Sequence, residues 1–495
     1  MTPTVQEDTS HSDRVVSDVA VRILTQIVLR LSGLILLPLV SKTLGVTAYG
    51  IWSQLIITAA LVVPVLDLRL GIACVRFLAG APSEELRRDV LPMSLTVLAS
   101  TLVVSGVAVL FAPQISAFLF GDTGQSVYVW LLAGMILART MFVFLRNFYR
   151  VTGQVKRYSG VELIASSASI LLAGVSVLVW QTLIGAVVAF IAVETGLAVI
   201  VAVDIARQVG TPRGVRFSSL GRYLRYSIPL IPNTLLLWAI NSSDRYVIAH
   251  LLDIKQVAVY SASYSLCHLS IFVLTPITFV LFPLLSRVWS EGRKEAVGMY
   301  VEQALRYYLL LALPSVGGLC VISSTALRLL ASQEFVTSDL LILLIAVGFL
   351  LLGVYQITLF VLHLHRRTGI LPVVFIVAAA INLGLNFLLI PRMGILGAAI
   401  STILAYLLQA VAVAGYAYRL LRFKIRAAFV YKAVGASALM TLVLWWIPAE
   451  SIFALIGIAV LGAVVYFLLM AATKEIGAKE LRMITSLVKR KGRAP

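Results

Sequence analysis

Three arginines lie within strongly apolar stretches of this 495-residue sequence, namely Arg30, Arg69 and Arg139. An arginine at the centre of a bilayer costs about 2.5–3.5 kcal/mol on insertion scales, so it is usually retained for a partner or a ligand. Counted from Arg22 and Tyr128, Arg30 lies about 12 Å and Arg139 about 16 Å into its stretch at 1.5 Å per helical residue. We expect both either to line a cavity for an anionic ligand or to form structural ion pairs.

An acidic residue lies at a depth similar to that of Arg139. Glu194 is the obvious candidate partner, and an ion pair between the two would leave less free positive charge for a ligand. Glu194 is also a candidate for ion coupling, as are Asp67 and His268. A lone histidine in an apolar stretch is more often an ordinary core residue.

Arg69 lies two residues after Asp67, a spacing at which side chains do not face each other on a regular helix. Pro64 and Gly71 favour local unwinding of this segment. The sequence leaves two alternatives for Arg69: it lines a cavity, or it extends toward the membrane surface while its aliphatic part stays buried.

Other polar residues lie in or beside apolar stretches. Asp244 and Arg245 are candidates for a gate or a contact between halves of the chain, with an interfacial anchor as the alternative. Asn382 and Asn386 could bind sugar hydroxyls in a cavity, although hydrogen bonds between helices are the commoner use of such residues.

The sequence contains no pattern typical of an enzyme active site. It has no phosphate-binding loop, nucleophile elbow, paired carboxylates in a soluble cleft or zinc-ligand spacing. Cys74, Cys267 and Cys320 are far apart and odd in number, so they predict no disulfide framework. We therefore expect no catalytic residue, no metal and no cofactor.

The composition excludes a water-soluble fold. Sixty per cent of the residues are apolar, 13% are charged and the mean hydropathy is +0.99, whereas soluble domains are roughly 45–50% apolar and about 25% charged.

The opening segment is polar and has no signal-peptide pattern, so we expect the first apolar stretch to be retained. Windows of about 19 residues predict fourteen transmembrane helices, some bent at internal Pro or Gly. Their ranges are 22–41, 50–78, 90–111, 128–146, 161–180, 183–203, 224–243, 257–285, 303–323, 338–362, 370–390, 394–416, 430–448 and 451–472.

The net charge of +18 fits this topology. Of the 40 Lys and Arg, 32 fall on one side of the predicted membrane, five on the other and three within spans. The positive-inside rule then places both termini in the cytoplasm. The high pI is therefore explained by topology, and we expect no nucleic-acid partner.

A weak internal repeat divides the chain. Tyr49 and Tyr260, Gly185 and Gly397, and two Thr-Gly pairs recur at offsets of 211, 212 and 216 residues. Such repeats are typical of transporters with two pseudo-symmetric lobes around a central cavity. The expected organisation is an N-terminal tail 1–21, a six-helix lobe 22–207, a linker 208–223, a second six-helix lobe 224–420, two further helices within 430–472 and a basic tail 473–495. That tail has the pattern of a helix lying on the membrane surface.

Several of these residues carry a resemblance to a known family. The segments are 44–50, Asp244-Arg245 followed by Val259-Tyr260, and 386–391 continuing through 394–399. They resemble Wzx-type O-antigen and exopolysaccharide flippases of the multidrug/oligosaccharidyl-lipid/polysaccharide (MOP, MATE-like) superfamily, over nearly the whole chain. The motifs identify the family but not the sugar.

The resemblance implies a flippase of the bacterial inner membrane. It would move an undecaprenyl-pyrophosphate-linked oligosaccharide from the cytoplasmic to the outer leaflet by alternating access, with a polysaccharide polymerase and chain-length proteins as potential partners. The alternatives are a cation-coupled multidrug exporter of the same fold, a membrane glycosyltransferase or polymerase, and an assembly scaffold. The short outward loops disfavour an enzyme, and intramembrane arginines favour an anionic cargo over a cationic drug.

Overall fold

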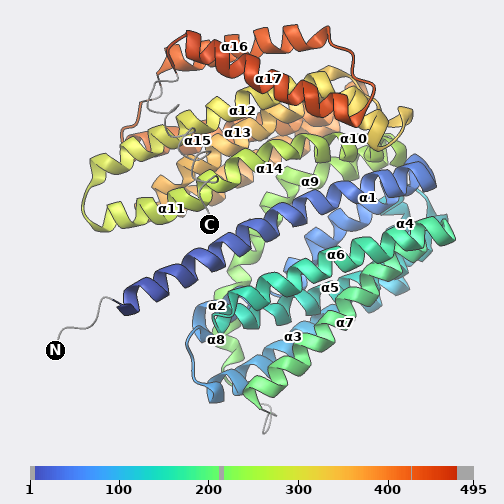
Figure 1. Cartoon of the computed structure of the whole chain (residues 1–495). Helices are drawn as coiled ribbons and strands as arrows, with labels where there is room; N and C mark the ends of the chain where they lie inside the picture. Colours follow the sequence, from blue (N-terminus) through green and yellow to red (C-terminus); the bar gives the residue numbers. More distant parts are fainter. Residues whose placement is uncertain (1–5, 211–216, 425, 476–495) are drawn as a thin grey trace, which may run out of the picture. The chain divides into compact units, whose positions relative to one another are not determined.

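The computed structural model describes residues 6–210, 217–424 and 426–475, with side chains at Thr25 and from Ile35 onward, and the secondary structure of these residues is entirely helical (Figure 1). The expected all-α architecture is therefore confirmed. The α-helices are α1 (Gln6–Leu66), α2 (Leu70–Leu78), α3 (Ser83–Leu110), α4 (Ala112–Phe120), α5 (Ser126–Val151), α6 (Val155–Trp180), α7 (Leu183–Val209), α8 (Leu220–Ser227), α9 (Ile231–Leu251), α10 (Ile254–Cys267), α11 (Leu274–Ser290), α12 (Lys294–Leu330), α13 (Asp339–Leu364), α14 (Leu371–Met393), α15 (Ile395–Leu420), α16 (Ala427–Trp445) and α17 (Ile452–Ala472). The 3₁₀ turns are η1 (Thr123–Gln125), η2 (Ile228–Leu230), η3 (His268–Val273), η4 (Gln333–Phe335) and η5 (Thr368–Ile370).

Within the described ranges, twelve helical segments are long and apolar enough to cross a membrane. The difference from the fourteen expected spans has two causes. The first two expected spans are two helices that meet at a kink inside α1 and count as one segment, and α9 has the length of a span but carries polar residues such as Asn241, Asp244 and Arg245. Large apolar side chains also lie on the outside, Trp446 being 81% and Phe453 86% exposed. Such apolar surface is what a lipid-facing helix requires, so the chain is a multi-pass membrane protein.

Two of the apolar segments that the sequence predicted to bend are interrupted, the first between Pro64 and Gly71 and the second ahead of Pro276. Inside the second expected span, α1 ends at Leu66, and α2 begins only after a turn in which Leu68 and Arg69 have φ values of 49° and 52°. The eighth expected span is divided into α10 and α11 by η3. Short 3₁₀ stretches and left-handed non-glycine residues are costly and often mark functional positions.

The gap expected between the first two spans is a kink rather than a loop. At Gly45 the backbone has a φ of 85° and a ψ of 179°, a conformation open to glycine, and helix continues on both sides of it. Because α1 begins at Gln6, the tail expected at 1–21 is largely helical in backbone. Residues 476–495, which carry most of the predicted surface helix, lie outside the described residues.

The chain separates into two compact units, one of residues 1–261 with 386–394 and the other of 262–385 with 395–495. In the first unit α5 packs against α7, α3 and α2, and α6 packs against α7 and α1. In the second unit the principal pairs are α13 with α15 and α12 with α13 and α16. The predicted lobe boundaries remain predictions.

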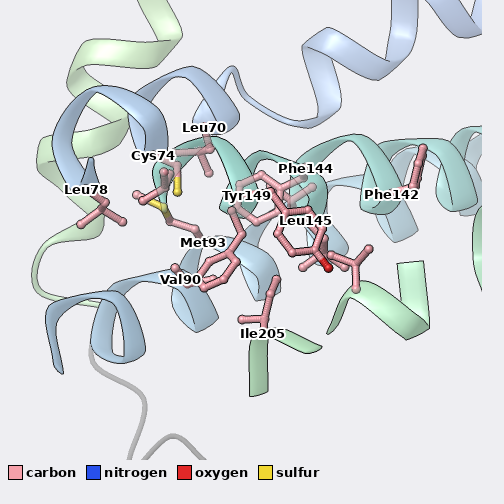
Figure 2. Close-up of a cluster of buried hydrophobic side chains, with 14 of the residues drawn as sticks. Leu70, Cys74, Leu78, Val90, Met93, Phe142, Phe144, Leu145, Tyr149 and Ile205 are labelled. Carbon is pink, nitrogen blue, oxygen red and sulfur yellow. The ribbon is translucent and has the colours of Figure 1, made fainter. Parts of the chain in front are cut away.

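The interior of the first unit fixes the position of α5. Leu70, Cys74, Val90 and Met93 pack around Tyr149 and its neighbours on α5 (Figure 2). These side chains come from α2, α3 and α5, so burial of one apolar cluster holds three helices in register.

Helix α8, whose first half lies in the expected linker and whose second half opens the seventh expected span, is part of this same unit. The Tyr223 hydroxyl donates to the Asp89 carboxylate at 2.5 Å, and the Ser219 hydroxyl donates to the same carboxylate at 2.6 Å. Burial, together with the hydrogen bond to Asp89, raises the pKa of Tyr223 to about 12, so its hydroxyl remains a donor at neutral pH. The connection to α9 is thus anchored on α3.

Close packing in the second unit gives a test of the fold. A Cβ at Gly353 would lie 2.1 Å from the Tyr308 ring, whose hydroxyl donates to the carbonyls of Phe349 and Leu350. We expect Gly353→Ala to lower stability by about 1–3 kcal/mol through overpacking, seen as a lower thermal unfolding midpoint in detergent. Gly415→Ala, where a Cβ meets nothing within 4 Å, is the control, and equal midpoints for the two variants would contradict the packing.

Candidate functional site

Three arginines follow one face of α5. Arg139, Arg146 and Arg150 are spaced by seven and four residues, so they lie on one side of the helix about 10 and 6 Å apart along its axis. We call these three residues the arginine row. Arg139 lies two residues from the midpoint, residue 137, of the candidate span Thr123–Val151, whereas Arg150 is next to its end.

Arg139 forms the ion pair that the sequence suggested. Its Nη1 lies 3.7 Å from Oε1 of Glu194, which comes from α7. The two side chains differ in burial: that of Glu194 is 8% exposed and that of Arg139 is 37% exposed. The second carboxylate oxygen of Glu194 has no hydrogen-bond partner among the described residues. Arg139 therefore keeps an open side while its carboxylate partner is enclosed.

Arg146 is held more tightly. Its Nη1 lies 3.1 Å from Oε1 of Glu162 on α6, and the two side chains are only 15% and 13% exposed. The guanidinium also lies over the rings of Phe142 and Tyr158, with centroid distances of 5.4 and 5.1 Å. Such cation–π contacts strengthen when they are shielded from water.

The sequence alone missed Arg146, because it is the last residue of the fourth expected span and was counted among the cytoplasmic charges. Helix α5 instead continues to Val151 and carries Arg146 inside the fold. Its spacing of seven from Arg139 was the signal that could have identified it.

Arg150 completes the row at the end of α5. It is exposed, lies 5.8 Å from the ring centroid of Tyr158 and donates to Oδ1 of Asn147 at 3.3 Å. Nearby, Arg157 is paired with Asp204 at 3.2 Å and does not belong to the row. Guanidinium groups bind phosphate oxygens through paired hydrogen bonds, so the more open Arg139 and Arg150 can bind phosphate, whereas Arg146 is enclosed and already paired with Glu162.

The break between α1 and α2 lies against this region. Oδ1 of Asp67 accepts a hydrogen bond from the backbone N–H of Arg69 at 2.6 Å, so the two residues stabilise a turn instead of forming a facing pair. A Cβ at Gly71 would lie 2.6 Å from Nδ2 of Asn147, the residue after Arg146. The Nε of Arg69 is buried without a hydrogen-bond partner among the described residues. Close approach at Gly71 therefore brings the turn onto α5.

Asp244 and Arg245 form a buried pair in α9. Nη1 of Arg245 lies 2.8 Å from Oδ1 of Asp244, whose other oxygen accepts from the Tyr260 hydroxyl at 2.7 Å. The Arg245 guanidinium also lies over the Tyr260 ring at 5.0 Å. These contacts favour a structural role, and a gating role stays a prediction.

The other candidates lie elsewhere. Nδ2 of Asn382 donates to the Thr402 hydroxyl at 3.3 Å, Asn386 is buried, and His268 lies in η3 with its ring edge-on to Phe349. The side chain of Arg30 is outside the described residues, so its role as a cavity residue stays a prediction.

Sequence comparisons match part of this chain to a known family. A sequence model of a family described as polysaccharide biosynthesis protein matches residues 15–289. The probable low-salt glycan biosynthesis flippase Agl15 of Haloferax volcanii is 22% identical over 201 residues, which cover 41% of this chain and 42% of that protein. The chain spans less than half the length of the curated relatives it matches.

Solved structures show the fold. The lipid II flippase MurJ, in an inward closed conformation, superposes with a TM-score of 0.77 at 14% identity, over 92% of this chain and 99% of that one. An inward-facing multidrug resistance MATE family transporter of the MOP superfamily gives a TM-score of 0.60 at 14% identity, over 80% and 94%. The fold is thus one that membrane transporters use, and the expected MATE-like architecture is confirmed.

The Arg146–Glu162 pair gives a prediction about stability. Removing one partner of a buried pair costs about 3–5 kcal/mol, whereas replacing both by apolar residues is often neutral. We therefore expect Arg146→Met to lower the thermal unfolding midpoint in detergent and Arg146→Met/Glu162→Leu to recover it. A double variant no more stable than the single one would contradict the pairing.

Proposed function

Because this chain belongs to the polysaccharide biosynthesis protein family, we propose that it is a flippase for an undecaprenyl-pyrophosphate-linked oligosaccharide. It moves this lipid from the cytoplasmic to the outer leaflet of the bacterial inner membrane by alternating access, for assembly of a surface polysaccharide. The related Haloferax flippase and the fold of the lipid II flippase support this class of substrate.

The arginine row is the observation that carries the proposal. A pyrophosphate is multiply anionic, and its passage through the membrane requires cations at depth. Arg139 provides one near the middle of its span with more than a third of its side chain exposed, and Arg146 and Arg150 continue toward the end of α5. A fully lipid-facing arginine at that depth would be costly, so the open side of Arg139 faces a polar path.

The acidic residues of the first unit argue against a cation exporter. Such a transporter needs carboxylates that are free to bind a cation. Here Glu194 and Glu162 pair with arginines of the row, and Asp67 accepts a backbone hydrogen bond in a tight turn. The charge left available on this face is positive, which suits an anionic cargo.

The remaining parts of the proposal concern topology and partners. The basic loops support a topology with both termini in the cytoplasm, where the lipid-linked unit is made, and a polymerase and chain-length proteins act on the product. The chemistry is translocation without bond cleavage, so it needs neither a catalytic residue nor a cofactor.

A reconstituted assay tests this function. Proteoliposomes are loaded with undecaprenyl pyrophosphate bearing a fluorescent disaccharide, and outward movement is followed with a membrane-impermeant quencher. We expect Arg139→Ala to slow translocation about tenfold to a hundredfold, because a hydrogen bond to a charged group contributes about 1.5–3 kcal/mol. Arg139→Lys keeps the charge but loses the planar fork, so it restores only part of the rate.

The matched control is Arg157→Ala, which removes an arginine paired with Asp204 outside the row and should leave the rate unchanged. Arg30→Ala is expected to impair transport as well, with membrane insertion intact. Normal rates in both Arg30→Ala and Arg139→Ala, or transport of a cationic dye in place of the labelled lipid, would overturn the proposal.

A further inference from the structure

The ion pair between Arg139 and Glu194 is unlike the other buried pairs of the first unit. Its N···O distance of 3.7 Å exceeds the 3.1 Å of Arg146–Glu162 and the 2.8 Å of Arg245–Asp244. At that distance the two charges attract each other but make no good hydrogen bond. The pair is therefore loose and easily exchanged.

The burial of the two partners differs in a way that favours replacement of Glu194 by another anion at Arg139. Glu194 is enclosed, with 8% of its side chain exposed, whereas Arg139 is 37% exposed. An incoming anion can therefore reach the guanidinium from its open side without contacting the carboxylate. Among the described residues, the free oxygen Oε2 of Glu194 has no donor that would fix the carboxylate in place.

Each charge depends on the other when no ligand is present. An ionised carboxylate or guanidinium at membrane depth without a counter-charge is strongly disfavoured. Arg146 is a second cation whose field reaches Glu194, but Glu162 already holds it at 3.1 Å. When the site is empty, Glu194 is thus the counter-ion of Arg139, and an anionic ligand must compete with it.

We propose that Glu194 is a built-in counter-ion that neutralises Arg139 in the empty carrier and is displaced from it by the phosphate of the cargo. The displaced carboxylate stays within the field of Arg146. This inference rests on the proposed function. Competition by Glu194 weakens binding of the anion, which allows its release at the far side. The same carboxylate lets the empty carrier return with a neutral pair in place of a bare guanidinium.

The first measurement is binding of undecaprenyl pyrophosphate to the purified full-length protein in nanodiscs. Glu194→Gln removes the competing charge at nearly constant size, so we expect the Kd to fall about fivefold to tenfold. Asp204→Asn is the matched control on the same helix, because its carboxylate is held at the end of α7 by Tyr149 and Arg157, and its Kd should stay within about twofold of wild type.

The second measurement compares exchange with net transport in proteoliposomes, using undecaprenyl pyrophosphate bearing a fluorescent disaccharide. Exchange needs only the loaded carrier to cross, whereas net transport also needs the empty carrier to return. We expect Glu194→Gln to keep exchange while net transport falls about tenfold. A purely structural pair would lower both rates together and would not tighten binding.

Glu194→Asp provides a second test of binding if Glu194→Gln fails to fold. The shorter carboxylate retains the charge but lies farther from Arg139, so we expect a smaller fall in Kd. An unchanged or raised Kd in folded Glu194→Gln, or in Glu194→Asp, would overturn the counter-ion role. If Arg139→Ala loses binding meanwhile, the proposed function stands, whereas a wild-type protein that neither binds nor moves the lipid would refute the function itself.

Discussion

The high cost of isolated charge in a low-dielectric membrane governs the organisation of the first unit. Every charged side chain of α5 at membrane depth is accompanied by a carboxylate from a neighbouring helix: Glu194 from α7 for Arg139, and Glu162 from α6 for Arg146. These pairs bind α5, α6 and α7 to one another at defined depths. What distinguishes the two pairs is tightness, since Arg146 is clamped between a carboxylate and two rings whereas Arg139 is left partly open. The site and the fold are thus built from the same interactions.

The breaks in the helices are subject to a similar cost. A broken span exposes backbone N–H and C=O groups, which need hydrogen-bond partners within lipid. At the end of α1, the carbonyl of Leu66 accepts from the Ser100 hydroxyl at 2.6 Å and Asp67 accepts from the N–H of Arg69. The break therefore remains hydrogen-bonded while Gly71 approaches α5 closely. A second interruption occurs at η3, in the eighth expected span. Discontinuous helices near the binding region are common in transporters, and their presence in both the second and the eighth spans fits the internal repeat.

Hydropathy was sufficient to predict the fold class, because apolar stretches of span length have few alternatives in a membrane. It was also sufficient to identify Arg139 and Glu194 as candidate partners, since they lie at similar depth in the fourth and the sixth expected spans. It failed at Arg146, because that residue is the last of its expected span, and window averaging cannot tell a loop arginine from one sheltered by Glu162 and Tyr158. The partners that shelter Arg146 are far apart in the sequence, so no local window contains them. At the first gap the local signal was sufficient, because the two expected spans are two helices that meet at the non-helical Gly45.

The membrane potential gives the Arg139–Glu194 pair a thermodynamic role in the proposed cycle. Moving a negative charge from a negative interior to a positive exterior is favourable by about 2.3 kcal/mol per charge at 100 mV. An anionic cargo therefore gains this energy on the loaded step without a coupling ion. A site that returned with a bare guanidinium would add a charged, desolvated step to every cycle. Because Glu194 neutralises Arg139 in the empty site, the return carries no net charge there, and the potential acts on direction through the cargo alone.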